Sequence, residues 1–215
     1  MPPQRSKVEI KGFEAKFYDI IMKILTFGEY EKWIETAVNE AEIKNNTKIL
    51  EFGCGTGIAA RKVLKNLEEN GLYIGIDISE IMLKKAYKKC KNSKNIFFIK
   101  KRIEEKLDFF KNKFDAVFMS FVMHGFENED KIKIIKNAYN NLKSKGKFII
   151  LDYSQNNFQN LKLWQKIFIS KIECPLAEDF IKRNLKNILK PHSFQHINEY
   201  YFIDNIIRLA IFKKT

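Results

Sequence analysis

Cysteine, proline and long apolar runs are all scarce in this sequence. Its 215 residues include three cysteines and four prolines. The cysteines, Cys54, Cys90 and Cys174, are widely spaced and odd in number, which excludes a disulfide framework and a paired metal motif. The apolar stretches are far shorter than the about 20 residues that cross a bilayer, and no secretory signal precedes them. We therefore expect a protein of the reducing cytoplasm.

Arginine is also scarce, although the chain is basic. Lysine and arginine total 39 against 26 acidic residues, a net charge of +13, yet arginine occurs at only five positions. Arginine is the residue suited to bidentate phosphate recognition. A solvated lysine-rich surface is therefore the favoured interpretation, and a nucleic-acid or anionic-lipid partner is the less favoured alternative. No metal site is expected: His192 and His196 flank turn residues beside Pro191 and lack a third ligand.

Short apolar runs alternate with helical patterns along the chain. Because several runs are apolar at consecutive positions, they are typical of strands covered on both faces. This alternation predicts an α/β fold with a mostly parallel sheet and helices on both faces. The tail predicts a helix and then two strands whose short connection allows only an antiparallel edge pair. The predicted strands are Lys48–Phe52, Leu72–Ile76, Ile96–Ile99, Ala116–Ser120, Phe148–Leu151, Glu199–Ile203 and Ile206–Phe212, and the tail helix is Phe180–Lys190.

A glycine-rich turn follows the first predicted strand. Glu51-Phe-Gly53-Cys-Gly55-Thr-Gly57 has the pattern G-x-G-x-G with an acid two positions ahead. Glycines at a strand-to-helix turn let a ligand approach the main chain closely. The dinucleotide fingerprint G-x-G-x-x-G differs, which argues against an NAD dehydrogenase. Asp77 stands at the tip of the second strand, where its carboxylate can accept both hydroxyls of a ribose.

These two motifs resemble those of the class I S-adenosylmethionine (SAM)-dependent methyltransferases. Phe114–His124 resembles the fourth-strand region of the same family, and Leu142–Asp152 its fifth strand. The resemblance implies a Rossmann-like sheet of seven strands, with SAM as cofactor and S-adenosylhomocysteine as product. The cofactor-binding residues that it implies are Glu51, Gly53, Cys54, Gly55, Thr56, Gly57, Asp77, Ile78, Met82, Arg102, Ile103, Ser120 and Phe121.

A closer resemblance is to the ubiquinone/menaquinone-biosynthesis C-methyltransferases. Their "YD…LSFG…W", "SFGLRN" and "LEFS" segments are similar to Tyr18–Trp33, Ser120–Gly125 and Leu151–Ser154. His124 and Gly125 replace an Arg-Asn pair. An acid or amide that usually meets adenine after the third strand is replaced by Lys100–Glu104, so the adenine contact shifts to Ile103 or Glu104. The resemblance implies a small-molecule acceptor, quinone-like or lipid.

Methyl transfer requires an acceptor held in line with an activated methyl group and, for a carbon or oxygen acceptor, a base. His124 is the best candidate because imidazole titrates near neutral pH; its alternative role is structural. Asp152 and Tyr153, at the tip of the fifth strand, are the other catalytic candidates. The predicted acceptor pocket consists of Tyr18, Trp33, His124 and Trp164.

We expect a single domain over residues 1–215. Its parts are an N-terminal helical extension or lid (1–46), a SAM-binding core (47–155) and acceptor-side helices with a terminal strand pair (156–215). Asn157–Lys171, which mixes apolar side chains with lysines, is either a lid or a helix that contacts membrane lipid. Two other functions stay open: an RNA methyltransferase, favoured by charge alone, and a SAM-binding protein without catalysis.

Overall fold

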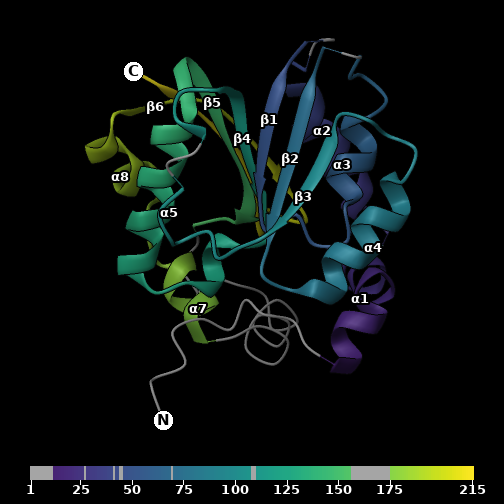
Figure 1. Cartoon of the computed structure of the whole chain (residues 1–215). Coiled ribbons are helices and arrows are strands. Elements are labelled where there is room, and N and C mark those ends of the chain that lie inside the picture. Colours follow the sequence, from purple (N-terminus) through teal and green to yellow (C-terminus); the bar gives the residue numbers. More distant parts are fainter. Residues whose placement is uncertain are drawn as a thin grey trace.

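A single mixed sheet organises the protein. The computed structural model describes residues 12–26, 28–40, 42–43, 46–68, 70–107, 110–155 and 175–215. Seven strands form the sheet in the order β3-β2-β1-β4-β5-β7-β6 (Figure 1). The strands β3, β2, β1, β4 and β5 are parallel to one another. Strand β7 is antiparallel to both of its neighbours, β5 and β6. The predicted seven-stranded, mostly parallel sheet with an antiparallel edge is confirmed.

The predicted strands lie close to the observed ones. The central strands are buried along nearly their whole length, as the consecutive apolar residues predict. Strand β5 begins well before the predicted Phe148, directly at the end of the preceding helix. The bounds are β1 Lys48–Phe52, β2 Leu72–Asp77, β3 Ile96–Lys100, β4 Phe114–Ser120, β5 Leu142–Tyr153, β6 Phe194–Phe202 and β7 Ile207–Lys214.

Helices cover both faces of the sheet. Figure 1 shows α2, α3 and α4 on one side and α5 and α8 on the other, with α1 and α7 near the end of the sheet where the parallel strands terminate. The bounds are α1 Gly12–Leu25, α2 Tyr30–Glu40, α3 Ile58–Val63, α4 Glu80–Cys90, α5 Asn128–Asn141, α7 Pro175–Ile181 and α8 Leu185–Leu189, with short 3₁₀ turns η2 Met123–Gly125 and η4 Lys190–His192. Among these helices, none is both long and apolar enough to cross a bilayer.

One local prediction is wrong. The predicted helix Phe180–Lys190 is divided into α7 and α8, because the side chain of Asn184 accepts hydrogen bonds from the backbone N–H groups of Lys186 and Asn187 and so starts a new helix. Gly146 lies inside β5, where a Cβ atom would come within 3.0 Å of the carbonyl oxygen of Lys143.

Candidate functional site

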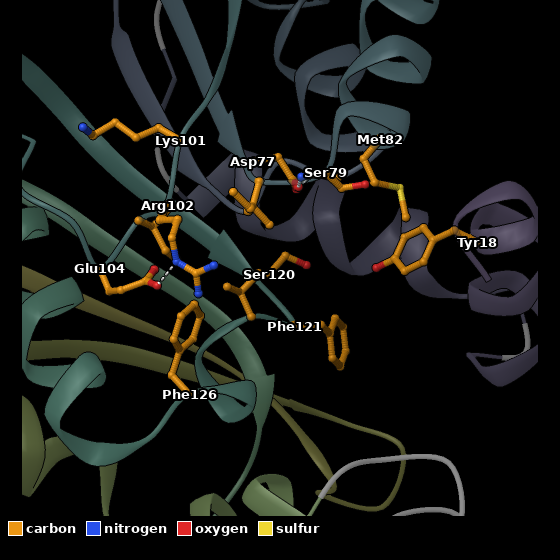
Figure 2. A pocket seen from close by; sticks show the side chains of 15 residues that line it. Tyr18, Asp77, Ser79, Met82, Lys101, Arg102, Glu104, Ser120, Phe121 and Phe126 are labelled. Atoms are coloured by element: carbon orange, nitrogen blue, oxygen red, sulfur yellow. Dashed lines mark hydrogen bonds and ion pairs between the residues drawn. The ribbon is translucent and has the colours of Figure 1, made fainter. Parts of the chain in front are cut away.

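A pocket opens where β1 to β4 end; the empty space in and over it, open solvent included, is about 660 Å³. Loops that follow parallel strands meet at this edge, which is where open α/β sheets bind ligands. Figure 2 shows Tyr18 of α1 and Met82 of α4 at one side of the pocket, and Arg102, Glu104 and Phe126 at the other. The lining residues are Tyr18, Gly53, Gly55, Asp77, Ile78, Ser79, Met82, Lys101, Arg102, Ile103, Glu104, Ser120, Phe121, Val122 and Phe126.

The glycine turn after β1 forms the floor of this pocket. The backbone N–H groups of Gly53 and Cys54 donate to the carbonyl of Ile76, which joins the turn to β2. A Cβ atom on Gly53 would lie 2.4 Å from Cγ2 of Val122, so only glycine fits there. Gly55 has φ +50° and no atom within 4 Å of a Cβ position. A side chain at Gly55 would therefore extend into the pocket itself.

Asp77 lies beside the glycine turn at the tip of β2. Its Oδ2 accepts the backbone N–H of Gly55 and its Oδ1 that of Ser79, both at 2.8 Å. A carboxylate has about four acceptor sites, two on each oxygen. A carboxylate at this place, which holds the glycine turn and faces the pocket, is the kind of group that accepts the two hydroxyls of a ribose.

The opposite wall carries an ion pair and apolar side chains. Nε of Arg102 donates to the carboxylate of Glu104 (Figure 2). Ile103 and Phe126 beside them are buried, and Met82 and Phe121 contribute further apolar surface. Ligand sites in proteins are typically apolar pockets of this kind with a few fixed polar groups.

Glu51 is buried beneath the pocket and does not line it. The hydroxyl of Tyr73 on β2 donates to its carboxyl group. Burial raises the pKa of Glu51 to about 8, and the negative charge of Asp77 adds to this rise, while the Tyr73 hydrogen bond opposes it. Glu51 is therefore mainly protonated at neutral pH. Cys54 is also buried, and burial raises the pKa of its thiol well above the usual value, which argues against a nucleophile.

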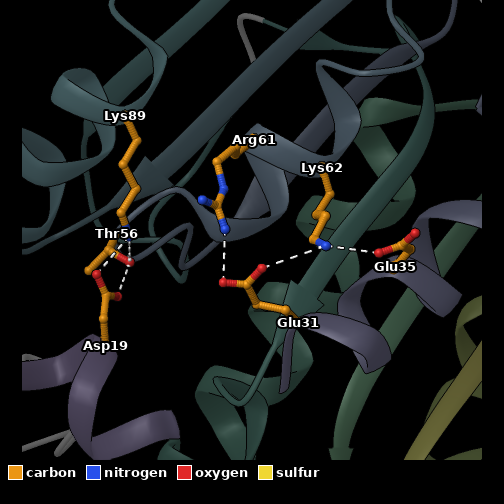
Figure 3. Close-up of polar contacts among 7 residues, drawn as sticks. All are labelled: Asp19, Glu31, Glu35, Thr56, Arg61, Lys62 and Lys89. Atoms are coloured by element: carbon orange, nitrogen blue, oxygen red, sulfur yellow. Dashed lines mark hydrogen bonds and ion pairs between the residues drawn. The ribbon is translucent and has the colours of Figure 1, made fainter. Parts of the chain in front are cut away.

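Ion pairs join the N-terminal helices to this edge of the sheet (Figure 3). Asp19 of α1 accepts the hydroxyl of Thr56 at 2.5 Å and pairs with Nζ of Lys89 at 2.7 Å. Burial raises the pKa of Asp19, but the hydrogen bonds from Lys89 and Thr56 outweigh this effect and lower it below the ordinary value. On α2, Glu31 pairs with Arg61 of α3 at 2.8 Å. The contacts of Asp19 place its neighbour Tyr18 against the pocket.

Aromatic residues of α2 support the end of β4. The hydroxyl of Tyr30 lies 3.0 Å from Oγ of Ser120, and its ring meets Phe121 edge-on. Trp33 is buried, stacked on Phe202 at 5.5 Å. Trp33 therefore packs behind Phe121 and does not line the pocket.

A buried histidine–aspartate pair lies next to the pocket. Nδ1 of His124, in the η2 turn after β4, is 2.7 Å from Oδ1 of Asp152 at the end of β5. Oδ2 of Asp152 accepts the backbone N–H of His124 at 3.2 Å, and the ring of Tyr153 meets the imidazole edge-on at 5.1 Å. In the neutral tautomer with its proton on Nδ1, where the carboxylate of Asp152 accepts it, the lone pair that can take up a proton is on Nε2.

The structure brings together most of the residues that the sequence indicated. Ten of them line the pocket: Tyr18, Gly53, Gly55, Asp77, Ile78, Met82, Arg102, Ile103, Ser120 and Phe121. Outside its lining are Glu51, Cys54, Thr56, Gly57, Trp33 and the group His124, Asp152 and Tyr153, while Trp164 lies outside the described residues. The pocket-lining residues Ser79, Lys101, Val122 and Phe126 were missed. Their positions just after strand ends are the signal that could have found them.

The sequence matches the ubiE/COQ5 methyltransferase family over residues 8–190. The chain belongs to this family. It is 36% identical to the ubiquinone/menaquinone biosynthesis C-methyltransferase UbiE of Wigglesworthia glossinidia brevipalpis over 149 residues, which cover 67% of this chain and 58% of that protein. It is 27% identical to a 2-phytyl-1,4-naphtoquinone methyltransferase of a Nostoc species over 76% of this chain and 72% of that protein.

The fold of the ubiE/COQ5 family member also agrees with solved structures. A crystal structure of a SAM-dependent methyltransferase from Aquifex aeolicus matches it with a TM-score of 0.70 and 18% identity, over 95% of this chain and 98% of that one. The family supports SAM as the cofactor, and the residues of the pocket fit it: open space lies beside Gly55, and the carboxylate of Asp77 stands next to the glycine turn.

Proposed function

We propose that this protein transfers a methyl group from SAM to a ring carbon of a quinone-like small molecule in its reduced, hydroxylated form. The observation that carries this proposal is the buried pair of His124 and Asp152, with Nδ1 and Oδ1 2.7 Å apart. The pair lies beside a pocket whose glycine turn and Asp77 suit SAM. The names of the two relatives, both quinone methyltransferases, support the acceptor class.

Two neighbouring groups of residues have different roles: those of the pocket would hold SAM, and the pair His124 and Asp152 acts on the acceptor. Asp77 would accept the ribose hydroxyls, the Gly53–Gly57 turn would lie against the amino-acid part of SAM, and Ile103 or Glu104 would meet the adenine; Gly53, Gly55, Asp77, Ile103 and Glu104 all line the pocket. When bound, SAM supplies a methyl group that its sulfonium already activates. Nε2 of His124 accepts the proton of the acceptor's ring hydroxyl, which makes the ring carbon electron-rich. After this carbon has bonded to the methyl group, it loses its hydrogen as a proton to solvent, and the proton on Nε2 returns to the ring oxygen. Asp152 fixes the imidazole and stabilises its positive charge.

Two measurements test this function in sequence. Calorimetric titration with SAM should give saturable binding to the whole protein. Incubation with SAM and a reduced naphthoquinol should then yield a product one CH₂ unit heavier, together with S-adenosylhomocysteine. Binding without any product from quinol, lipid or RNA acceptors would contradict the methyltransferase and leave a SAM-binding protein. Product from RNA alone would contradict the small-molecule acceptor.

The proposal includes contact with membrane lipid, where lipid-soluble quinones reside. The predicted interfacial segment Asn157–Lys171 lies outside the described residues. Within them, Ile20 and Ile24 are exposed by 57% and 68% one turn apart on α1, with exposed Lys23 between them. Apolar side chains flanked by basic residues favour an anionic membrane surface. Because Tyr18 of the same helix lines the pocket, such contact would place the pocket near the bilayer.

Ile24→Glu should reduce flotation with phosphatidylglycerol vesicles at physiological salt several-fold, because it places a charge where apolar surface would enter the interface. Ile197→Glu, at a position 47% exposed on β6, is the matched control and should float like the parent protein. Equal flotation of the parent and Ile24→Glu would contradict contact through α1.

A further inference from the structure

Lys131 is buried in a way that packing alone does not explain. It is only 1% exposed, near the start of α5, and its Nζ has no hydrogen-bond partner among the residues that the structure describes. Nζ lies over the ring of Phe180 on α7, 5.1 Å from its centre. Burial of an ammonium group without a hydrogen bond costs free energy. Because of this cost, we expect a lysine at this position to have a function beyond packing.

The elements around Lys131 are those that carry the histidine–aspartate pair. Helix α7, whose Phe180 covers Nζ, packs on the η2 turn that carries His124 and on β5, which carries Asp152. Burial lowers the pKa of Lys131; the negative charge of Asp179 opposes this most strongly, and that of Asp152 comes next. Lys131 thus lies where α5, α7, β5 and the η2 turn meet.

The other charged groups near Lys131 either interact with another residue or are exposed to solvent. Asp179, on α7, accepts two hydrogen bonds from Arg183, at 2.7 and 2.9 Å, and this pair is largely exposed. Asp130 pairs with Lys133. Glu127, just before α5, also acts on Lys131. Arg208 of β7 stands opposite Asp152 in register and interacts with Tyr201. Of the acidic groups that act on Lys131, Asp152 is the one that is fully buried.

We propose that Lys131 is a positioning residue for the reaction: its buried positive charge acts on Asp152 and His124 and keeps the imidazole unprotonated until it accepts the proton of the acceptor. This inference rests on the proposed role of His124 as the base. A buried carboxylate raises the proton affinity of its histidine partner. A second positive charge within the same dry region opposes a charged imidazole and so lowers that affinity again. Lys131 thereby offsets Asp152, which can orient His124 without keeping it permanently protonated.

The test is the titration of His124 in the full chain, followed by NMR of its ring. The chain has three histidines, and His124→Gln identifies the resonance. In Lys131→Met the midpoint of His124 should rise by about half a unit to one unit, because an opposing charge is removed. Lys131→Arg retains the charge and should leave the midpoint unchanged. Asp152→Asn should move it in the opposite direction, downward.

Activity and stability supply readouts that a purely structural lysine would not give. The acidic limb of kcat/KM should move upward in Lys131→Met by the same amount as the NMR midpoint. The melting temperature should stay equal or rise, because methionine of similar length removes an unpaired buried charge and packs on Phe180.

Two results would overturn the inference: a His124 midpoint that does not move in Lys131→Met, or a raised KM for the acceptor with an unmoved midpoint, which would make Lys131 an acceptor contact. If Lys131→Met does not fold, Lys131→Gln decides the same question. The NMR titration needs no turnover, so a parent protein without methyltransferase activity would refute the proposed function and still decide whether Lys131 acts on His124.

Discussion

Replacement of Gly55 by valine is expected to weaken SAM binding at least about 100-fold, which corresponds to a loss of about 2.7 kcal/mol. Gly55 has φ +50° and lines the pocket, and open space lies where a Cβ atom would stand. The branched side chain would fill the space in which the amino-acid part of the cofactor meets the main chain. Asp77→Ala should give a similar loss, because it removes both ribose acceptors and leaves the N–H of Gly55 without its partner.

Backbone strain must be separated from loss of the binding surface. Gly28, between α1 and α2, is a matched position, since it also has a positive φ, +78°, and no atom within 4 Å of a Cβ position, but it does not line the pocket. Gly28→Val should lose stability as Gly55→Val does, because valine is strained at positive φ, yet bind SAM within a few-fold of the parent. Calorimetry on variants shown to be folded by circular dichroism measures both effects. Parent-like affinity of Gly55→Val and Asp77→Ala would remove the pocket as the SAM site.

Features that depend on residues close together in the sequence could be predicted from it. The strand Lys48–Phe52 was predicted to the residue, because apolar side chains at consecutive positions mark a strand covered on both faces. The glycine turn and Asp77 were placed at one edge, because the carboxyl ends of parallel strands always meet there. The antiparallel edge followed from a connection too short for a crossover.

Features that depend on packing across the sheet were not predictable in the same way. The direct hydrogen bond between His124 and Asp152 exists because β4 and β5 are neighbours with Ser120 opposite Leu151, a register that the sequence does not specify. Glu51 pairs with Tyr73 inside the sheet and leaves the pocket wall to other residues. Lys131 stands three and four residues before Ile134 and Ile135, on the buried face of α5. Helical spacing alone indicates that Lys131 lies on this buried face. Because lysine is polar, however, its burial could not be expected from the sequence pattern.

Substitution of His124 by glutamine is expected to lower kcat for methyl transfer by about 10³-fold and to leave the SAM dissociation constant within a few-fold of the parent. General-base catalysis contributes about 10²–10⁴-fold, and His124 does not line the SAM pocket. The residual rate should rise at high pH, because a ring hydroxyl with a pKa of about 10 then ionises without a base. His192→Gln, the same change in the η4 turn, is the matched control and should retain parent activity.

Asp152→Asn should lower kcat by a comparable factor, because an amide cannot both accept the Nδ1 proton and offset a charged imidazole. If the two residues act as a unit, the double variant His124→Gln/Asp152→Asn should be no slower than the slower single variant. Single-turnover kinetics with a quinol acceptor measure these rates without interference from product release. Additive losses in the double variant would mean that Asp152 acts on the reaction independently of His124, since a residue whose only function is to orient the imidazole has nothing left to orient once the imidazole is gone.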